Sequence, residues 1–260
     1  MNKNWLAAWT LWLREMVRFY RQPSRVVGAL GSPFIFWLLI GSGIGTSFQT
    51  GGERMSYLNY FFPGTLLLIL LFTAIFSTIS LIEDRREGFF QSVLVAPIPR
   101  SSLVLGKIMG GSTLAFSQGL LFLLCAPLIG IHLGLLAWLR VAAVLFINAF
   151  ALTALGFIIA WQFQSIQGFH AVMNLFLIPL WLLSGALFPP EGAMGWIRTV
   201  MKINPLTYGL VSLHRSLFPG AALAGSAPFG FSAAIIILFG AALFILASVL
   251  ASRPNVNHQP

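Results

Sequence analysis

Residues 55–82 read MSYLNYFFPGTLLLILLFTAIFSTISLI and contain no Asp, Glu, Lys or Arg. An α-helix rises 1.5 Å per residue, so about 20 apolar residues cross the hydrocarbon core of a bilayer. One charged side chain at the centre of such a segment would cost about 2.5–3.5 kcal/mol, and this segment has none. The stretch therefore predicts a transmembrane helix, and it makes the bilayer the solvent in which the chain folds.

Five further charge-free runs of similar character accompany this one. They cover residues 26–48, 108–131, 141–161, 169–188 and 229–251. A polar stretch at 162–168 separates the run that ends at Trp161 from the run that begins at Phe169. We therefore predict an all-α membrane protein, with a six-span domain over residues 26–253, an N-terminal cytoplasmic segment at 1–25 and a cytoplasmic tail at 254–260.

The composition excludes an ordinary soluble domain. The chain is 58% hydrophobic and 8% charged, with a mean hydropathy of +0.88, whereas soluble domains are about 25% charged. The net charge of +9 lies beside the apolar runs, where anionic lipid headgroups explain it better than nucleic acid does. Cys125 is the single cysteine, so it forms no internal disulfide and we expect it to be an apolar packing residue.

Lys and Arg residues at the span ends predict the orientation. Ten of them fall on one side and five on the other if the N-terminus is inside, which favours two cytoplasmic termini. The inner ten are Lys3, Arg14, Arg18, Arg21, Arg25, Arg85, Arg86, Arg100, Lys107 and Arg253, and the outer five are Arg54, Arg140, Arg198, Lys202 and Arg215. The first run is longer than the 7–15 residues of a signal-peptide core, so we expect a retained span rather than a cleaved one.

Residues 1–25 carry a helical pattern of their own. Apolar and aromatic residues recur at helical spacing, while Arg14, Arg18 and Arg21 lie on another side; the apolar set is Trp5, Leu6, Trp9, Trp12, Leu13, Met16 and Phe19 or Tyr20. This pattern is typical of a helix in the plane of the inner interface, ended by Pro23. The alternative is a plain cytoplasmic start of the first span.

Motifs for catalysis, metal binding and nucleotide binding are missing. There is no His-Glu-x-x-His and no Gly-x-Ser-x-Gly, and Gly106-Lys107 is followed by Ile108 where a P-loop has Ser or Thr. We expect no catalytic, cofactor or metal site, so any ATP must be bound by another subunit. An ion-coupled secondary carrier is the alternative, although carriers usually place an ionisable group at membrane depth. A membrane enzyme or scaffold is a third reading.

The polar stretch after residue 82 contains a short amphipathic segment. Phe89, Phe90, Val93 and Leu94 fall on one helical face, behind a charged cluster, and Pro97 and Pro99 end the segment. Such a face needs a partner, either a protein groove or the membrane surface. The charged cluster would be able to form salt bridges to that partner; it consists of Glu83, Asp84, Arg85, Arg86 and Glu87, and Gly88 follows it.

A second amphipathic element precedes the last span. Asn204 is suited to cap a helix whose first residue is Pro205, and Leu206, Leu210, Leu213 and Leu217 would line its inner face. Just before it, Trp196, Ile197, Val200 and Met201 form another short apolar face. These pieces would dip into the outer interface or cover a translocation path; the alternative is a surface loop packed on its own spans.

These segments together resemble the ABC-2 type permeases. The resemblance rests on Glu83–Gly88, on Pro97-Ile98-Pro99-Arg100, on Leu105-Gly106-Lys107 and on Asn204-Pro205-Leu206-Thr207-Tyr208. The chain departs from the family at Phe89-Phe90-Gln91, where Thr-Leu-Glu is common. Small-residue pairs such as Gly106-x-x-x-Gly110 we interpret as helix packing rather than a dimer contact.

The resemblance implies a permease subunit of an ATP-binding cassette exporter in the bacterial inner membrane. It implies a homodimer, with each copy docked on a separate ATP-binding subunit through a coupling helix, and an outer element that includes Asn204, Pro205 and Tyr208. The docking residues would be Glu83, Asp84, Arg85, Arg86, Glu87, Gly88, Phe89, Phe90, Val93 and Leu94. Exporters of polysaccharides, nodulation factors and antibiotics share these features, so the exported molecule stays open.

Overall fold

A computed structural model describes residues 3–44, 56–89, 99–219 and 226–252. All regular secondary structure within these ranges is helical, which confirms the predicted all-α class. The long helices are α1 (Lys3–Tyr20), α2 (Pro23–Ile44), α3 (Tyr57–Arg86), α5 (Arg100–Leu123), α6 (Leu135–Gln162), α7 (Ile166–Trp181) and α10 (Phe229–Ser252). Shorter pieces are η2 (Ala126–Ile129), η3 (Leu182–Ala186), η4 (Pro190–Gly192), α8 (Gly195–Ile203) and α9 (Pro205–Leu217).

Helix α3, the segment that decides the fold, is the central helix. It is buried along nearly its whole length, and α2, α5 and α6 pack against it. The outer helices α2, α7 and α10 leave most of their apolar surface uncovered, including Leu39, Leu175 and Leu238, each 67% exposed. Apolar faces of this size are stable only in an apolar solvent. The packing therefore supports the prediction that the bilayer surrounds this bundle.

Five of the described helical segments are long and apolar enough to cross a membrane: α2, α3, α6, α7 with η3, and α10. The remaining predicted span, residues 108–131, is the third in chain order and corresponds to α5, η2 and the turn at Gly130. Helix α5 is as long as α10 and packs on α3 and α6, but polar residues such as Ser112, Thr113 and Gln118 reduce its hydropathy.

Several helices extend beyond the predicted spans. Helix α3 continues to Arg86, so the charged residues after 82 lie on its last turn, and α5 begins at Arg100 rather than at 108. Helix α6 begins at Leu135, which places Arg140 inside the helix. Span prediction stops at the first charge, whereas a helix continues as long as its backbone hydrogen bonds can form, so these charged turns were missed.

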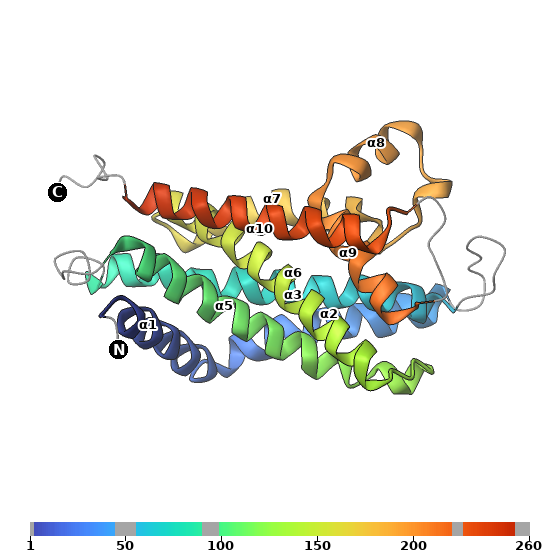
Figure 1. The fold of residues 1–260 in the computed structure, drawn as a ribbon, viewed down its shortest axis with the longest axis horizontal. Helices are drawn as coiled ribbons and strands as arrows, with labels where there is room; N and C mark the ends of the chain where they lie inside the picture. Colours follow the sequence, from blue (N-terminus) through green and yellow to red (C-terminus); the bar gives the residue numbers. More distant parts are fainter. Residues whose placement is uncertain (1–2, 45–55, 90–98, 220–225, 253–260) are drawn as a thin grey trace.

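Helix α7 ends differently from the other spans. Pro179 removes a backbone donor near its end, and the chain passes into the π-helical turn η3, where Gly185 adopts a φ of +92°. The left-handed region is open to glycine at little cost. Figure 1 shows α8 and α9 at this end of the bundle, opposite the N-terminus of α1 and the C-terminal end of α10. The two short amphipathic pieces predicted before the last span are confirmed as helices, and their location on the outer side stays a prediction.

Helix α1 packs closely on α5 at a pair of glycines. Ala8 and Leu11 pack on Gly106, and Glu15 packs on Gly110, so closely that an added Cβ would lie 2.7–2.8 Å from them. The Gly106–Gly110 pair serves packing within the chain, as predicted. Helix α1 also leaves several apolar and aromatic residues exposed, namely Trp5, Leu6, Trp9, Leu13 and Tyr20.

Candidate functional site

The C-terminal end of α3, which is predicted to be cytoplasmic and is called the inner end below, contains a fully buried carboxylate, Asp84, held by three cations. Arg14 of α1 donates two hydrogen bonds to it, of 2.8 and 2.7 Å, and Arg18 donates one of 2.5 Å. Lys107 of α5 also pairs with Asp84. Since Asp84 is 0% exposed, its charge is stable only because it is paired. The pKa of Arg14 is raised, because the hydrogen bond and charge of Asp84 outweigh the lowering by burial.

A second buried carboxylate, Glu15 of α1, completes the cluster. It accepts a hydrogen bond of 2.6 Å from Lys107 and one of 2.5 Å from Ser80 of α3. Glu15 and Lys107 are 4% and 6% exposed. Lys107 thus lies between two carboxylates and ties α1, α3 and α5 together. We refer to Arg14, Glu15, Arg18, Asp84 and Lys107 as the inner charge cluster.

The other charges on this turn of α3 also find partners within the chain. Glu83 pairs with Arg18 at 3.1 Å and with Arg25 of α2, and Glu87 pairs with Arg18 at 3.2 Å. Arg85 donates to the carbonyl of Trp161, at 3.1 Å, at the end of α6. These contacts fasten the inner end of α3 to α1, α2 and α6.

The remaining predicted docking residues lie at or beyond the end of α3. Arg86 Nε donates to the carbonyl of Gln164 at 3.0 Å, and Gly88 has a φ of +73°, the left-handed conformation that commonly ends a helix. The ring of Phe89 lies 3.7 Å below the guanidinium of Arg14, a cation–π contact. The predicted residues Phe90, Val93 and Leu94 lie outside the described part of the chain.

The structure brings the predicted charged residues together with residues that sequence reasoning had not assigned to the site. Arg14 and Arg18 had been placed on the polar side of α1, Lys107 had been assigned only as an inner cation and as part of the Leu105-Gly106-Lys107 motif, and Glu15 had no assigned role. A signal existed in the sequence, because a spacing of four residues puts Arg14 and Arg18 on one helix face, but nothing indicated which carboxylate they would meet. As folded, the cluster joins the last turn of α3, which precedes Phe89, to α1 and α5.

The outer element is built as its sequence predicted. The side chain of Asn204 caps α9 by accepting from the amide of Leu206 at 3.0 Å, and Pro205 is the first residue of the helix. Leu206, Leu210, Leu213 and Leu217 are all buried. The Asn204 amide also donates to the carbonyls of Leu180 and Leu183, at 2.6 and 3.1 Å, and so joins α9 to the end of α7. Tyr208 donates to the carbonyl of Lys202 at 2.7 Å.

Two tyrosines at the outer end of α3 complete this junction. Tyr60 donates a 2.6 Å hydrogen bond to the carbonyl of Gly185, and Tyr57 donates one of 2.6 Å to the carbonyl of Leu187. The carbonyls freed by the π-helical turn are thereby satisfied, as buried backbone groups must be. Helix α3 therefore contacts the predicted docking segment at one end and the kink of the fifth span at the other.

Comparison with known proteins assigns this architecture to a family. The family model described as "ABC-2 type transporter" matches residues 7–218. The chain is 23% identical to the daunorubicin resistance ABC transporter permease protein DrrB1 of Streptomyces coeruleorubidus, over 82% of this chain and 74% of that one. It is 25% identical to nodulation protein J of Rhizobium leguminosarum bv. trifolii (80% and 78%) and 21% identical to the inner membrane transport permease YadH of Escherichia coli (97% and 97%). The chain is an integral membrane protein and belongs to the ABC-2 type transporter family.

Proposed function

We propose that this chain is the membrane-spanning subunit of an ATP-driven exporter of the bacterial inner membrane, with both termini in the cytoplasm. In this proposal α5 is also a span, which brings the number of spans to six. It packs against α3 and α6 and leads through the apolar residues 124–131 to the opposite end of the bundle. Two copies would form the translocation path, and each would dock one ATP-binding subunit.

The observation that supports this proposal best is the attachment of the inner end of α3. The predicted docking segment starts at Gly88 and Phe89, directly after a turn that is fixed to α1, α2, α5 and α6 by ion pairs and hydrogen bonds. A force applied to that segment would therefore displace the attached helices of the bundle, instead of deforming a loop alone. An ion-coupled carrier has no need of such a support.

The proposed docking surface therefore differs in emphasis from the sequence-based prediction. The side chains of Glu83, Asp84 and Glu87 are engaged with arginines of the same chain, so we assign them to the support. The contacts with the ATP-binding subunit fall to Phe89, Phe90, Val93 and Leu94. The outer element around Asn204 and Tyr208 would cover the outer end of the path.

The test is to isolate the tagged chain from gently solubilised native membranes and to measure the co-purifying ATP-binding subunit. The double variant Phe90→Asp/Val93→Asp should lose that subunit and export while still inserting in the membrane. The matched control is Met194→Asp/Trp196→Asp, which puts two aspartates at exposed apolar positions (69% and 63% exposed) of the opposite end. It should retain the subunit.

Three results would count against the proposal. If the wild-type chain is isolated alone under conditions that preserve other transporter complexes, or if export follows an ion gradient in the absence of any ATPase, the secondary carrier is the better reading. If both double variants lose the subunit equally, the docking segment is not the contact.

A further inference from the structure

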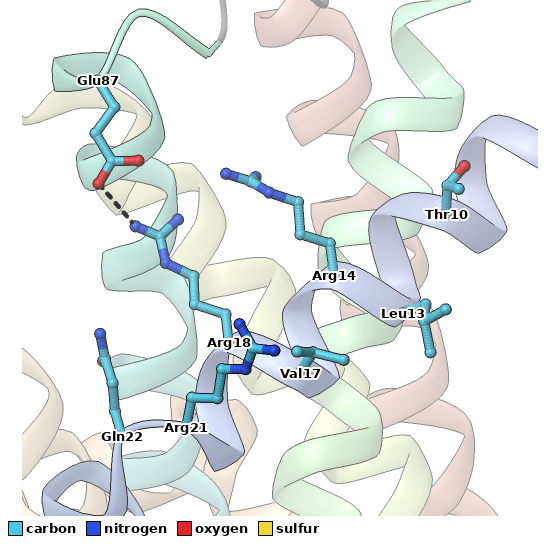
Figure 2. A pocket seen from close by; sticks show the side chains of 8 residues that line it. All are labelled: Thr10, Leu13, Arg14, Val17, Arg18, Arg21, Gln22 and Glu87. Atoms are coloured by element: carbon cyan, nitrogen blue, oxygen red, sulfur yellow. Dashed lines mark hydrogen bonds and ion pairs between the residues drawn. The ribbon is translucent and has the colours of Figure 1, made fainter.

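A basic pocket lies at the surface of the molecule, beside the inner charge cluster. Figure 2 shows the pocket, which is lined by Arg14 and Arg18 of α1 and by Arg21 just after the end of α1; the side chain of Arg18 points toward Glu87. The pocket has a volume of about 710 Å³ and is open to the surroundings. Arg14 and Arg18 are balanced by Asp84, Glu83 and Glu87, so Arg21 supplies the positive charge of the wall that no described carboxylate offsets. None of the exporter functions proposed above uses this pocket.

One of the three arginines has no protein partner. Arg14 and Arg18 are engaged with Asp84 and Glu87, whereas the side chain of Arg21 makes no hydrogen bond or ion pair within the described residues and is exposed. A guanidinium offers a planar set of donors that suits the oxygens of a phosphate. Arg21 is therefore available to an anion in the pocket.

A second unpartnered group lines the same pocket. The carbonyl Oε1 of Gln22 is buried and has no hydrogen-bond donor in the described structure. A buried acceptor without a donor costs about 1–3 kcal/mol. A ligand with an anionic phosphate for Arg21 and a hydroxyl donor for Gln22 would satisfy both groups, and a glycerophosphate headgroup has both.

The rim of the pocket indicates the depth in the membrane at which the ligand lies. Leu13 and Val17, 46% and 44% exposed, form the apolar side of the pocket. Trp9 and Tyr20 are also exposed on α1, and aromatic residues of this kind collect at the level of lipid headgroups. An apolar rim beside a phosphate-binding wall fits an amphiphile better than it fits a free anion or the polar surface of a soluble subunit.

We propose that this pocket binds an anionic glycerophospholipid, with its phosphate on Arg21, its headgroup hydroxyl on Gln22 and its acyl chains along Leu13 and Val17. Basic sites at the membrane surface are known to hold such headgroups. The bound lipid would fix the position of α1, and with it the arginines that hold Asp84.

The experiment is native mass spectrometry of the purified full-length chain, titrated with phosphatidylglycerol or with phosphatidylcholine. We expect the wild type to bind phosphatidylglycerol more tightly than phosphatidylcholine. The affinity for phosphatidylglycerol should fall about fivefold in Arg21→Gln, since one basic residue at the surface contributes about that factor. It should fall by less in Gln22→Leu. Arg21→Lys should retain most of the binding. Arg140→Gln, which removes a cation at the opposite end of the bundle, is the matched control and should bind as the wild type does.

Three outcomes would overturn the proposal. Equal retention of phosphatidylglycerol by Arg21→Gln and the wild type would show that the lipid binds elsewhere. Displacement by millimolar inorganic phosphate or glycerol phosphate would mean that the pocket takes a free anion. Loss of the ATP-binding subunit from Arg21→Gln, with lipid binding unchanged, would assign the pocket to a protein interface.

Discussion

Replacing Lys107 by methionine tests whether the inner charge cluster is a balanced unit. Within the described residues, Lys107 is the only cation that forms an ion pair with Glu15, at 2.6 Å. Asp84 would keep its ion pairs with Arg14 and Arg18 if Lys107 were replaced. The variant therefore leaves Glu15 as a buried carboxylate supported by Ser80 alone. Breaking a buried ion pair in this way costs about 3–5 kcal/mol. At this chain length we expect the unfolding midpoint in detergent to fall by roughly 10 °C.

The double variant Glu15→Gln/Lys107→Met separates this reasoning from a simple packing defect. It removes the stranded charge and keeps the volume of both side chains, so it should recover about 2 kcal/mol or more relative to Lys107→Met. Thermal unfolding of the wild type, both single variants and the double variant gives the coupling energy. The reasoning is refuted if Lys107→Met costs less than about 1 kcal/mol, or if the double variant is no more stable than Lys107→Met.

Three further predictions concern other parts of the chain. Gly106→Val should lower the free energy of unfolding by about 1–3 kcal/mol, because the new Cβ would lie 2.7 Å from a carbonyl of α1. Gly134 has open space around it, so Gly134→Ala should leave the stability unchanged. Thermal unfolding of the two variants makes the comparison. Asn204→Ala should cost about 1–2 kcal/mol, measured the same way, through the lost cap and two uncovered carbonyls. Burial, with a smaller contribution from Arg215, lowers the pKa of His214 to about 4. Because the unfolded value is about 6.5, stability should be constant above that pH and fall by about 2 kcal/mol on going to pH 5; His214→Leu should abolish this dependence in unfolding measured against pH.

The helical class and the amphipathic pieces could be predicted from sequence because each depends on local pattern. The run at 55–82 predicted α3 through its length and lack of charge, and Asn204-Pro205 predicted the start of α9 through cap chemistry alone. The boundaries of α3 and α5 were less predictable, because charged residues end an apolar run without ending a helix. Arg85 illustrates the point: it remains on the last turn of α3, where the carbonyl of Trp161 accepts its hydrogen bonds.

The partners of the charges could not be predicted, because they depend on which helices become neighbours. Glu15 and Lys107 are far apart in sequence, and only the close crossing at Gly106 and Gly110 brings α1 near enough for the pair to form. The glycine spacing was visible and its role in packing was inferred, but the identity of the helix that fills the groove was not. The unpaired Arg21 was likewise visible only as one of several basic residues.

Helix α3 connects the two regions that the proposed transport cycle has to coordinate. At its inner end, Asp84 is fixed to α1 and α5, next to the segment proposed to contact the ATP-binding subunit. At its outer end, Tyr60 is bonded to Gly185, where the fifth span is already kinked and no longer follows the α-helical hydrogen-bond pattern. Helix α3 is buried along nearly its whole length, and a closely packed helix transmits displacement with little internal deformation, whereas a π-helical turn is a point at which a helix bends. A movement imposed at the inner end would therefore change the fifth span first, and through Asn204 it would reach the outer element.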